Sequence, residues 1–287
     1  MTRTELDLTN PATVRAVARR VGMHQSRRLG QHFLVDRAVL EAVVDALQPA
    51  GSDEVLEIGC GIGTLTGALA ARVRRVIAID VDVRCIAAAQ ITQRHRSNVT
   101  VLEQDVTRVD AAALGVAPTW LAAGNLPYHL TGPILSRLFE GPAPPRRGVF
   151  LVQREVAARL AAEHGEWSLA TVALRSIATI ERVRDVPPSA FQPPPAVDSA
   201  VVRLQPRAEL TPAERSAVIR LARRVFQQRR KTIRHGIAHA LGGEQAAARA
   251  ALEAATIDSR RRPGTLDLDE WRRLAGAVAG VGETGRE

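Results

Sequence analysis

The sequence has only two cysteines and no long apolar run, and both absences limit what the protein can be. Cys60 and Cys85 are too few for a disulfide framework or a zinc site, so we expect a reduced, cytoplasmic protein without a metal. No run of about 18 apolar residues is present, and the acidic opening MTRTELDLTN is unlike a secretory signal, so no membrane segment is expected. Hydrophobic residues still make up 46% of the 287 residues, which is ample for a globular core.

Lysine is almost absent as well, because Lys231 is the one lysine among 39 basic residues. The basic residues outnumber 30 acidic ones, and the net charge of +9 favours a polyanionic partner such as nucleic acid. An arginine-rich composition is also typical of a high-GC genome, so the clustering of the charges is more informative than their number. Between Arg215 and Arg234 the chain carries eight basic residues and no acidic one.

This basic stretch has a helical pattern of apolar residues that includes Val218, Leu221 and Val225. One face can therefore pack on the protein while the charges project outward, where contacts with phosphates would be salt-sensitive. A helix face that is merely solvated is the alternative, and SRR at 26–28 is a second basic candidate. The residues that we predict to bind RNA are Arg223, Arg224, Arg229, Arg230, Lys231 and Arg234.

Short apolar runs alternate with helical patterns between residues 54 and 152, which predicts βαβ units and a mostly parallel, doubly wound α/β sheet. Strands are expected at 54–58, 75–79, 99–103, 120–124 and 148–152, and helices at 11–22, 36–47, 64–72, 83–95 and 132–139. Two further runs, at 177–186 and 197–204, can add antiparallel strands, with the stiff connection 187–195 between them.

The pattern changes near residue 209, where the strand signals stop. Helical patterns at 212–228, 244–255 and 267–279 replace them. We therefore expect two domains, an α/β domain over residues 1–207 and a small all-helical domain over residues 208–287.

The segment EIGCGIGTLT (57–66) follows the first predicted strand and begins a helix. Gly59 and Gly61 allow a tight turn and the close approach of a ligand to the backbone. The second strand ends at Asp80, which can accept hydrogen bonds from both hydroxyls of a ribose, and the third ends at Asp105, which can accept one from an adenine amine. A simple glycine turn, and a helix N-cap at Asp105, are the plainer interpretations.

Together these residues indicate a nucleoside-bearing cofactor that lies across the strand ends. The glycine spacing G-x-G-x-G differs from the G-x-G-x-x-G pattern of dinucleotide-binding proteins. S-adenosylmethionine (SAM) fits better than NAD because it has no pyrophosphate to be cradled, and NAD remains the alternative for this segment.

Tyr128, the one tyrosine in the chain, lies in the segment NLPY (125–128) directly after the fourth predicted strand. Ligands bind at this edge of such sheets. The side-chain carbonyl of Asn125 and the backbone carbonyl of Leu126, in a turn fixed by Pro127, can accept hydrogen bonds from the exocyclic amine of a base and free its lone pair for methylation. Tyr128 offers an aromatic face for that base. The alternative is a proline turn with a packing tyrosine.

At these motifs the sequence resembles the ribosomal RNA adenine dimethyltransferases, specifically the KsgA/RsmA family, over roughly residues 25–274. LGQHFLVD resembles the family opening GQNFLxD, and EIGCGIGTLT, EQD and NLPY resemble the cofactor and target motifs of the family. VQREVAARL, DVPPSAFQPPPAVDSAVVRL and FQQRRKTIRHGI are closer still. The related Erm resistance methyltransferases share the first motifs without the last two in this form.

The resemblance implies a Rossmann-like methyltransferase domain followed by a helical domain. It implies SAM-dependent dimethylation of two adjacent adenosines near the 3′ end of 16S rRNA in the assembling 30S subunit, and we expect a monomer. It also implies that Phe191 sandwiches the target base with Tyr128, and a core position is the alternative for Phe191. The cofactor contacts that it implies are His32, Leu34, Gly59, Asp80, Asp105 and Asn125.

Three departures from the family pattern stand out. His32 replaces the usual Asn, Asp80 replaces the usual Glu, and the segment 163–175 lacks the expected YGRLS stretch. None of these changes removes the residues that would serve methyl transfer.

Other functions remain open at this point. An Erm-like enzyme would methylate 23S rRNA and confer antibiotic resistance, whereas a ribosome-assembly factor would bind RNA with secondary or lost catalysis. The intact segment 125–128 argues against lost catalysis. A DNA adenine methyltransferase is disfavoured because no part outside the methyltransferase core resembles a DNA-reading module.

Overall fold

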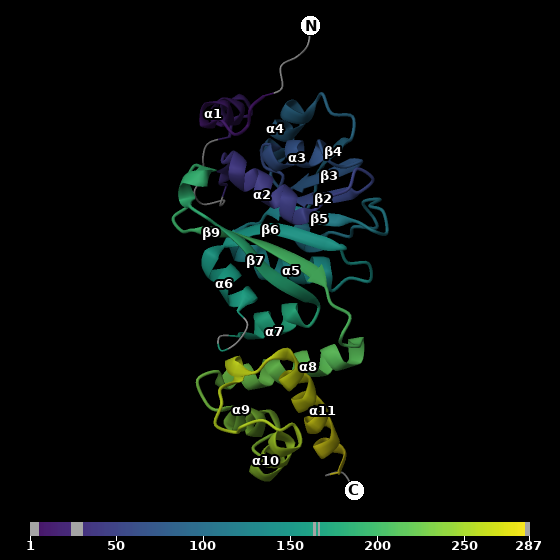
Figure 1. The fold of residues 1–287 in the computed structure, drawn as a ribbon, viewed down its shortest axis with the longest axis vertical. Helices are drawn as coiled ribbons and strands as arrows, with labels where there is room; N and C mark the ends of the chain where they lie inside the picture. Colours follow the sequence, from purple (N-terminus) through teal and green to yellow (C-terminus); the bar gives the residue numbers. More distant parts are fainter. Residues whose placement is uncertain (1–5, 24–30, 163–164, 166, 285–287) are drawn as a thin grey trace. The chain divides into compact units, whose positions relative to one another are not determined.

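The computed structural model describes residues 6–23, 31–162, 165 and 167–284 of the chain (Figure 1). The chain divides into two compact units. The first consists of residues 1–157 and 180–206, and the second consists of residues 158–179 and 207–287.

The first unit is built around a seven-stranded sheet with the strand order β4-β3-β2-β5-β6-β9-β7. Strands β2 to β6 are parallel where they pair, and β9 joins β6 in the antiparallel direction. This order confirms the predicted doubly wound α/β sheet. The strands are β2 (Glu54–Ile58), β3 (Arg75–Asp80), β4 (Val99–Glu103), β5 (Leu121–Asn125), β6 (Arg147–Gln153), β7 (Ala178–Val186) and β9 (Ser199–Pro206).

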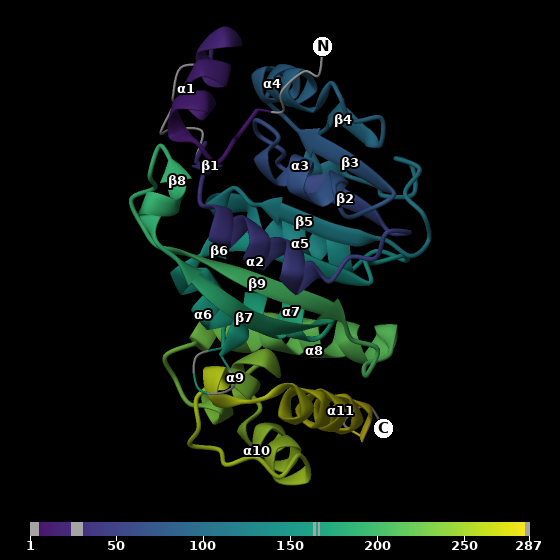
Figure 2. The same ribbon diagram turned by 45° about the horizontal axis from the view of Figure 1, so that its top comes forward.

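Helices cover both faces of this sheet. Successive strand residues point to opposite faces, and β2 is buried throughout while β5 is buried up to Asn125, so both faces of the central strands are covered. On one face, Val55 and Val149 pack in a core cluster with Leu47 of α2, which crosses the strands in Figure 2. On the opposite face, a Cβ at Gly148 would lie only 3.0 Å from the ring of Phe139 on α5. The helices are α1 (Pro11–Arg20), α2 (Arg37–Leu47), α3 (Thr64–Ala70), α4 (Val83–Gln93) and α5 (Thr131–Phe139).

The first two helices begin after capping residues and lie where the sequence predicts helices, at 11–22 and 36–47. The side chain of Asn10 accepts a hydrogen bond from the backbone N–H of Ala12, and Pro11 is the first residue of α1. Asp36 accepts a hydrogen bond from the N–H of Val39 at the start of α2. Both predicted helices are therefore confirmed.

A small second sheet was not predicted. β1 (Phe33–Leu34) pairs in the antiparallel direction with β8 (Phe191–Gln192), and the two lie side by side in Figure 2. The segment 187–195, predicted as an extended connection, also contains a 3-10 turn at Pro188–Ala190 and a cis peptide bond between Gln192 and Pro193. Strands of two residues have no detectable period, so the sequence pattern could not reveal this pairing.

The second unit is helical, as predicted for the residues after 207. Its core includes Leu221, Ile237, Leu252 and Trp271. The helices are α7 (Leu169–Arg175), α8 (Pro212–Val225), α9 (Ile233–Ala240), α10 (Gln245–Ala254) and α11 (Leu268–Thr284), and α6 (Arg154–Ala161) begins in the first unit and ends in the second. Helix α9 lies at the end of the basic stretch and was not predicted.

Residues 158–179 belong to the second unit, whereas the sequence prediction placed them in the first domain. Trp167 and Val172 pack into the core of the helical unit. The backbone N–H of Trp167 donates to the carbonyl of Gly264, and a side chain at Gly264 would collide with the Trp167 carbonyl. The predicted boundary near 207 therefore coincides with one passage of the chain between the units, but the earlier passage through the second unit, at 158–179, was missed. Gly264, the hydrogen-bond partner of Trp167, comes much later in the sequence.

The described residues offer neither a membrane helix nor a metal cluster. None of their helices combines the length and the apolar character needed to cross a membrane. Among the same residues, no three or more His, Cys, Asp or Glu side chains gather as metal ligands. Cys60 and Cys85 are both buried and free.

Candidate active site

A pocket of about 330 Å³ lies at the carboxyl ends of β2, β3 and β5 in the first unit. This is where ligands bind in doubly wound sheets. Five of the residues predicted from the sequence line it, namely His32, Gly59, Asp80, Asn125 and Pro127. Gln31, Val81, Asp82, Cys85, His129 and Leu130 also line it and were not predicted.

In the loop after β2, Gly59 and Gly61 share a backbone conformation but lie against different neighbours. Gly59 and Gly61 both have positive φ angles, of 73° and 55°. A Cβ at Gly59 would lie 3.2 Å from the backbone oxygen of Asn125, and one at Gly61 would lie 3.1 Å from the ring of Phe33. Glycine therefore lets the loop approach both β5 and β1.

Asp80 joins this loop to the end of β3. Its Oδ2 atom accepts a hydrogen bond from the backbone N–H of Gly61, and its Oδ1 atom accepts one from Asp82, both at 3.0 Å. Burial raises the pKa of the Asp80 carboxyl, and these hydrogen bonds oppose the rise. Each oxygen retains a further lone pair for a ligand hydroxyl. Val81 is 72% exposed in the same pocket and provides an apolar surface next to the carboxylate.

Glu57 is a buried acid beneath the same loop. Burial raises the pKa of Glu57 to about 8, and the neighbouring Asp80 carboxylate contributes to the rise. Its Oε2 atom has no hydrogen-bond partner among the described residues. The residue lines a small cavity of about 30 Å³ together with Leu34, Gly59 and Asn125. The sequence motif contains this acid, but burial is a property of the fold, so the sequence analysis did not single it out.

Asn125 is oriented by the opening motif of the chain. Its Nδ2 atom donates a hydrogen bond of 2.8 Å to the backbone carbonyl of His32. This leaves the Oδ1 atom as the end of the side chain that can accept a further hydrogen bond, because an amide has one donor end and one acceptor end. Phe33, which directly follows His32, pairs with Gln192 in the small sheet of β1 and β8.

The rest of the NLPY turn is also well fixed. Leu126 is buried, and its N–H donates to the carbonyl of Leu151. Pro127 accepts a hydrogen bond from the N–H of Leu130 and begins a short 3-10 turn. Tyr128 is half-buried, and its hydroxyl is 2.6 Å from Oγ of Ser199. Burial raises the pKa of the Tyr128 hydroxyl.

Six of the residues predicted for catalysis or cofactor binding are not among those that line the main pocket, namely Leu34, Gly61, Asp105, Leu126, Tyr128 and Phe191. Leu34 is buried in the core and lines the small cavity beneath the loop. Phe191 is 2% exposed and belongs to the same core cluster, so the structure shows the core position that the sequence left open. Asp105 is exposed, and its carboxylate accepts hydrogen bonds from the N–H and hydroxyl of Thr107, which lower the pKa of Asp105. Their roles toward a ligand remain predictions.

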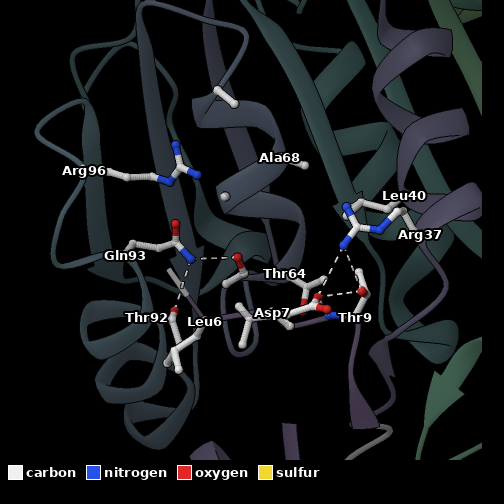
Figure 3. A pocket seen from close by; sticks show the side chains of 14 residues that line it. Leu6, Asp7, Thr9, Arg37, Leu40, Thr64, Ala68, Thr92, Gln93 and Arg96 are labelled. Carbon is white, nitrogen blue, oxygen red and sulfur yellow. Dashed lines mark hydrogen bonds and ion pairs between the residues drawn. The ribbon is translucent and has the colours of Figure 1, made fainter. Parts of the chain in front are cut away.

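A second pocket, of about 410 Å³, is lined by residues of α2, α3 and α4 and by residues 6–9 (Figure 3). Gln93 and Arg96 lie on one side of it and Arg37 on the other. None of the predicted site residues is among the described residues that line it. The buried amide of Gln93 donates to the carbonyl of Gly63, so α4 supports the glycine loop from behind.

The predicted RNA-binding residues lie in the helical unit and are all exposed. Arg223 and Arg224 lie on α8, Arg234 lies on α9, and the others lie between the two helices. None of them takes part in the ion pairs found between described residues. Arg224 donates a hydrogen bond to the carbonyl of Ala240. The basic candidate at 26–28 lies outside the described residues.

A family model described as ribosomal RNA adenine dimethylase matches residues 22–273 of the chain. The chain is 40% identical over 276 residues to the ribosomal RNA small subunit methyltransferase A of Anaeromyxobacter sp. (strain K), covering 91% of this chain and 95% of that one. It is 35% identical to the protein of the same name from Geobacillus thermodenitrificans, covering 95% and 97%.

Two solved structures are similar over nearly their whole length. A dimethyladenosine transferase from Plasmodium falciparum has a TM-score of 0.74 and 26% identity, and the match covers 87% of this chain and 98% of that one. The 23S rRNA methyltransferase ErmE has a TM-score of 0.70 and 26% identity, with 86% and 99% covered. Both matches cover more than four fifths of this chain, so they include much more than the strands of the sheet.

Proposed function

Since the chain belongs to the ribosomal RNA adenine dimethylase family, we propose that it transfers methyl groups from SAM to two adjacent adenosines near the 3′ end of 16S rRNA. The observation that carries the proposal is the hydrogen bond from Asn125 Nδ2 to the His32 carbonyl. With the amide nitrogen engaged there, the Asn125 carbonyl oxygen is the end of the side chain left to accept a hydrogen bond from an adenine amine.

The pocket fits the nucleoside part of SAM. The two carboxylate oxygens of Asp80 are held by backbone hydrogen bonds and can accept hydrogen bonds from ribose hydroxyls. The exposed side chain of Val81 can pack against a planar base. Gly59 keeps the backbone open, because a side chain there would fill the space next to Asn125. SAM, when bound, supplies an electrophilic methyl group. We propose that Gly59, Gly61, Asp80 and Asn125 hold it, with Asp105 reached from the adjacent strand end.

The target amine is held by acceptors. The Asn125 side-chain carbonyl and the Leu126 backbone carbonyl accept hydrogen bonds from the amine, and this favours the geometry in which the nitrogen lone pair can attack. No strong base is required beforehand, because the amine proton becomes acidic only after the methyl group has been transferred. The fixed turn at Pro127 costs no reorganisation during the reaction.

Small-subunit rRNA is favoured as the substrate by the names of the relatives that are 35 to 40% identical. The relative that acts on 23S rRNA is less similar, at 26% identity. The exposed arginines and lysine of the helical unit are suited to phosphate contacts. We propose that the enzyme acts as a monomer in the cytoplasm on the assembling 30S subunit.

Tritiated SAM, the purified protein and 30S subunits from a strain lacking the modification test the proposal directly. Free 16S rRNA, 23S rRNA and 50S subunits run in parallel, and the labelled positions are mapped by mass spectrometry. We expect label on 30S particles as two dimethyladenosines. Label on 23S rRNA would instead identify an Erm-like enzyme, and cofactor binding without label on any substrate would favour an assembly factor.

A further inference from the structure

A groove of about 430 Å³ lies on the helical unit, between α8 and α11. The two helices lie side by side in both views of the molecule (Figures 1 and 2). Ala217 and Leu221 line the groove from α8, and Ala275, Val278 and Ala279 line it from α11. These residues are three or four positions apart, so each helix presents one apolar face to the groove. The short alanine side chains leave the space between the two faces open.

Three arginines of α8, namely Arg220, Arg223 and Arg224, border this apolar floor. All three are exposed. Arg224 donates a hydrogen bond to the carbonyl of Ala240, which holds its side chain beside the end of α9. The side chains of Arg220 and Arg223 have neither a hydrogen-bond partner nor an ion-pair partner among the described residues. No acid is among the described residues that line the groove, so its border is wholly positive.

We propose that this groove takes one unpaired nucleotide of ribosomal RNA, with the base on the apolar floor and the flanking phosphates on the arginines. The proposal rests on the proposed function and assigns a second RNA contact to the same enzyme. Phosphates supply the negative charge that the border attracts, and the flat face of a base can pack on apolar side chains and on guanidinium planes. A paired base is held in its own stack, so the nucleotide has to be unpaired.

This contact differs from the one proposed for the link between α8 and α9. Arg229, Arg230 and Lys231 are exposed, and they are not among the described residues that line the groove. Charged side chains without an apolar floor bind the phosphates of paired and unpaired strands alike. The groove adds a contact that only an unpaired base can make, so the helical unit favours RNA with a single-stranded nucleotide at this place.

The groove can be filled without changing its charge. Ala279→Leu does so from α11, and Ala217→Leu does so from α8, where leucine also keeps the helix favourable. Ala279 is exposed, so the larger side chain does not enter the core. Ala246→Leu, at an exposed alanine of α10 outside the groove, is the matched control. Melting temperatures show whether each full-length variant is folded.

The probes are a short single-stranded uridine oligomer and an abasic ribose-phosphate oligomer of the same length and charge. Uridine offers no adenine to the candidate active site. Burying about 60 Å² of apolar base surface corresponds to about 10-fold in affinity, so the wild type should bind the uridine oligomer about 10-fold more tightly. Ala279→Leu and Ala217→Leu should remove this preference, and Ala246→Leu should keep it.

The arginines give a different readout. Arg220→Gln/Arg223→Gln should weaken the binding of both oligomers and lower the salt slope of log K by about 1.4, since each phosphate contact on a single strand contributes about 0.7. The preference for the oligomer with bases should remain, because the apolar floor is intact. An unchanged salt slope would overturn the assignment of phosphates to these arginines.

Equal binding of both oligomers by the wild type would overturn the proposal, and so would a preference that persists in both filled variants. A glutamate-rich helical peptide tests the other occupant that the charge allows. Binding of this peptide that Ala279→Leu abolishes, without base-dependent RNA binding, would identify a protein partner and overturn the RNA contact.

Methylation of 30S particles separates this proposal from the proposed function, because oligomer binding does not require methyl transfer. Base-dependent binding in a protein that methylates none of its substrates would count against the reaction and leave the groove assigned. Methylation of 30S particles without base-dependent binding would overturn the groove and leave the reaction in place.

Discussion

The two halves of the candidate active site are held together over different distances along the chain. In the cofactor half, Asp80 binds the N–H of Gly61, 19 residues away, and that of Asp82, two residues away. In the target half, His32, Asn125 and Tyr128 are held by hydrogen bonds between residues that are 71 to 161 positions apart. A local βαβ unit therefore builds the first half, while the second depends on how three distant segments pack.

This difference implies that the halves respond separately to substitution. Changes in the glycine loop and at Asp80 should alter the affinity for SAM. Changes at Asn125 should lower the rate of methyl transfer more than the affinity for SAM, because Asn125 is only one of the residues proposed to hold SAM. The helical unit should contribute a third, salt-sensitive component to the affinity for RNA.

The largest expected effect is that of Asn125→Ala on methyl transfer. Removing one preorganised acceptor should lower kcat by about 10²- to 10³-fold. Since Asp80 and the glycine loop remain intact, the Kd for SAM should change far less than kcat. Single-turnover methylation of 30S particles and calorimetric titration with SAM provide the two numbers. An equal loss in both would contradict the separation of the halves.

Asp80→Ala should weaken SAM binding more than it lowers kcat. A hydrogen bond to a charged group is worth about 1.5–3 kcal/mol, so the Kd for SAM should rise by about 10- to 100-fold. At saturating SAM most of kcat should remain, because the NLPY turn is unchanged. If kcat falls as far as in Asn125→Ala, the two halves act as one cooperative unit.

Neutralising the link between α8 and α9 tests the helical unit. The variant Arg229→Gln/Arg230→Gln/Lys231→Gln should weaken 30S binding and lower the salt slope of log K by about 2, since each phosphate contact contributes roughly 0.7–0.9. Arg249→Gln, an exposed arginine of α10, is the control. Binding measured at several salt concentrations gives the slope, and an unchanged slope would identify a merely solvated surface.

Gly61→Ala and Gly115→Ala form a matched pair, because both glycines have positive φ angles. Each change should cost about 1–2 kcal/mol in folding free energy. Only Gly61→Ala should also weaken SAM binding, since its Cβ would crowd the Phe33 ring whereas that of Gly115 meets nothing within 4 Å. Denaturant unfolding and SAM titration of both variants check this, and equal SAM affinities would refute it.

The smallest expected effect concerns pH and Glu57. Its pKa is raised from 4.5 to about 8 in the folded protein, mainly by burial. Between these values the folded protein keeps a proton that the unfolded chain has lost, so this group lowers stability as the pH rises through that window. Glu57→Gln should therefore gain stability relative to the wild type between pH 5 and pH 9. A difference in melting temperature that does not change with pH would show that Glu57 is ionised in the folded protein.

Features that depend on neighbouring residues were predictable. The alternation of strands and helices and the glycine loop follow from local patterns, because hydrogen bonds within a turn or a βαβ unit involve nearby residues. Even the NLPY turn was placed at the correct sheet edge. Helix α9 and the membership of residues 158–179 were missed, because the apolar contacts that decide them lie far apart in the sequence.

The sequence alone therefore determined the sheet, the pocket edge and the family. The tertiary structure alone decided which side chains share that pocket. It buried Phe191, used Asp105 as a cap and brought the His32 carbonyl within hydrogen-bond distance of Asn125. The physical reason is that burial and the distances between side chains are set by packing between segments, and no local pattern encodes which distant segments will meet.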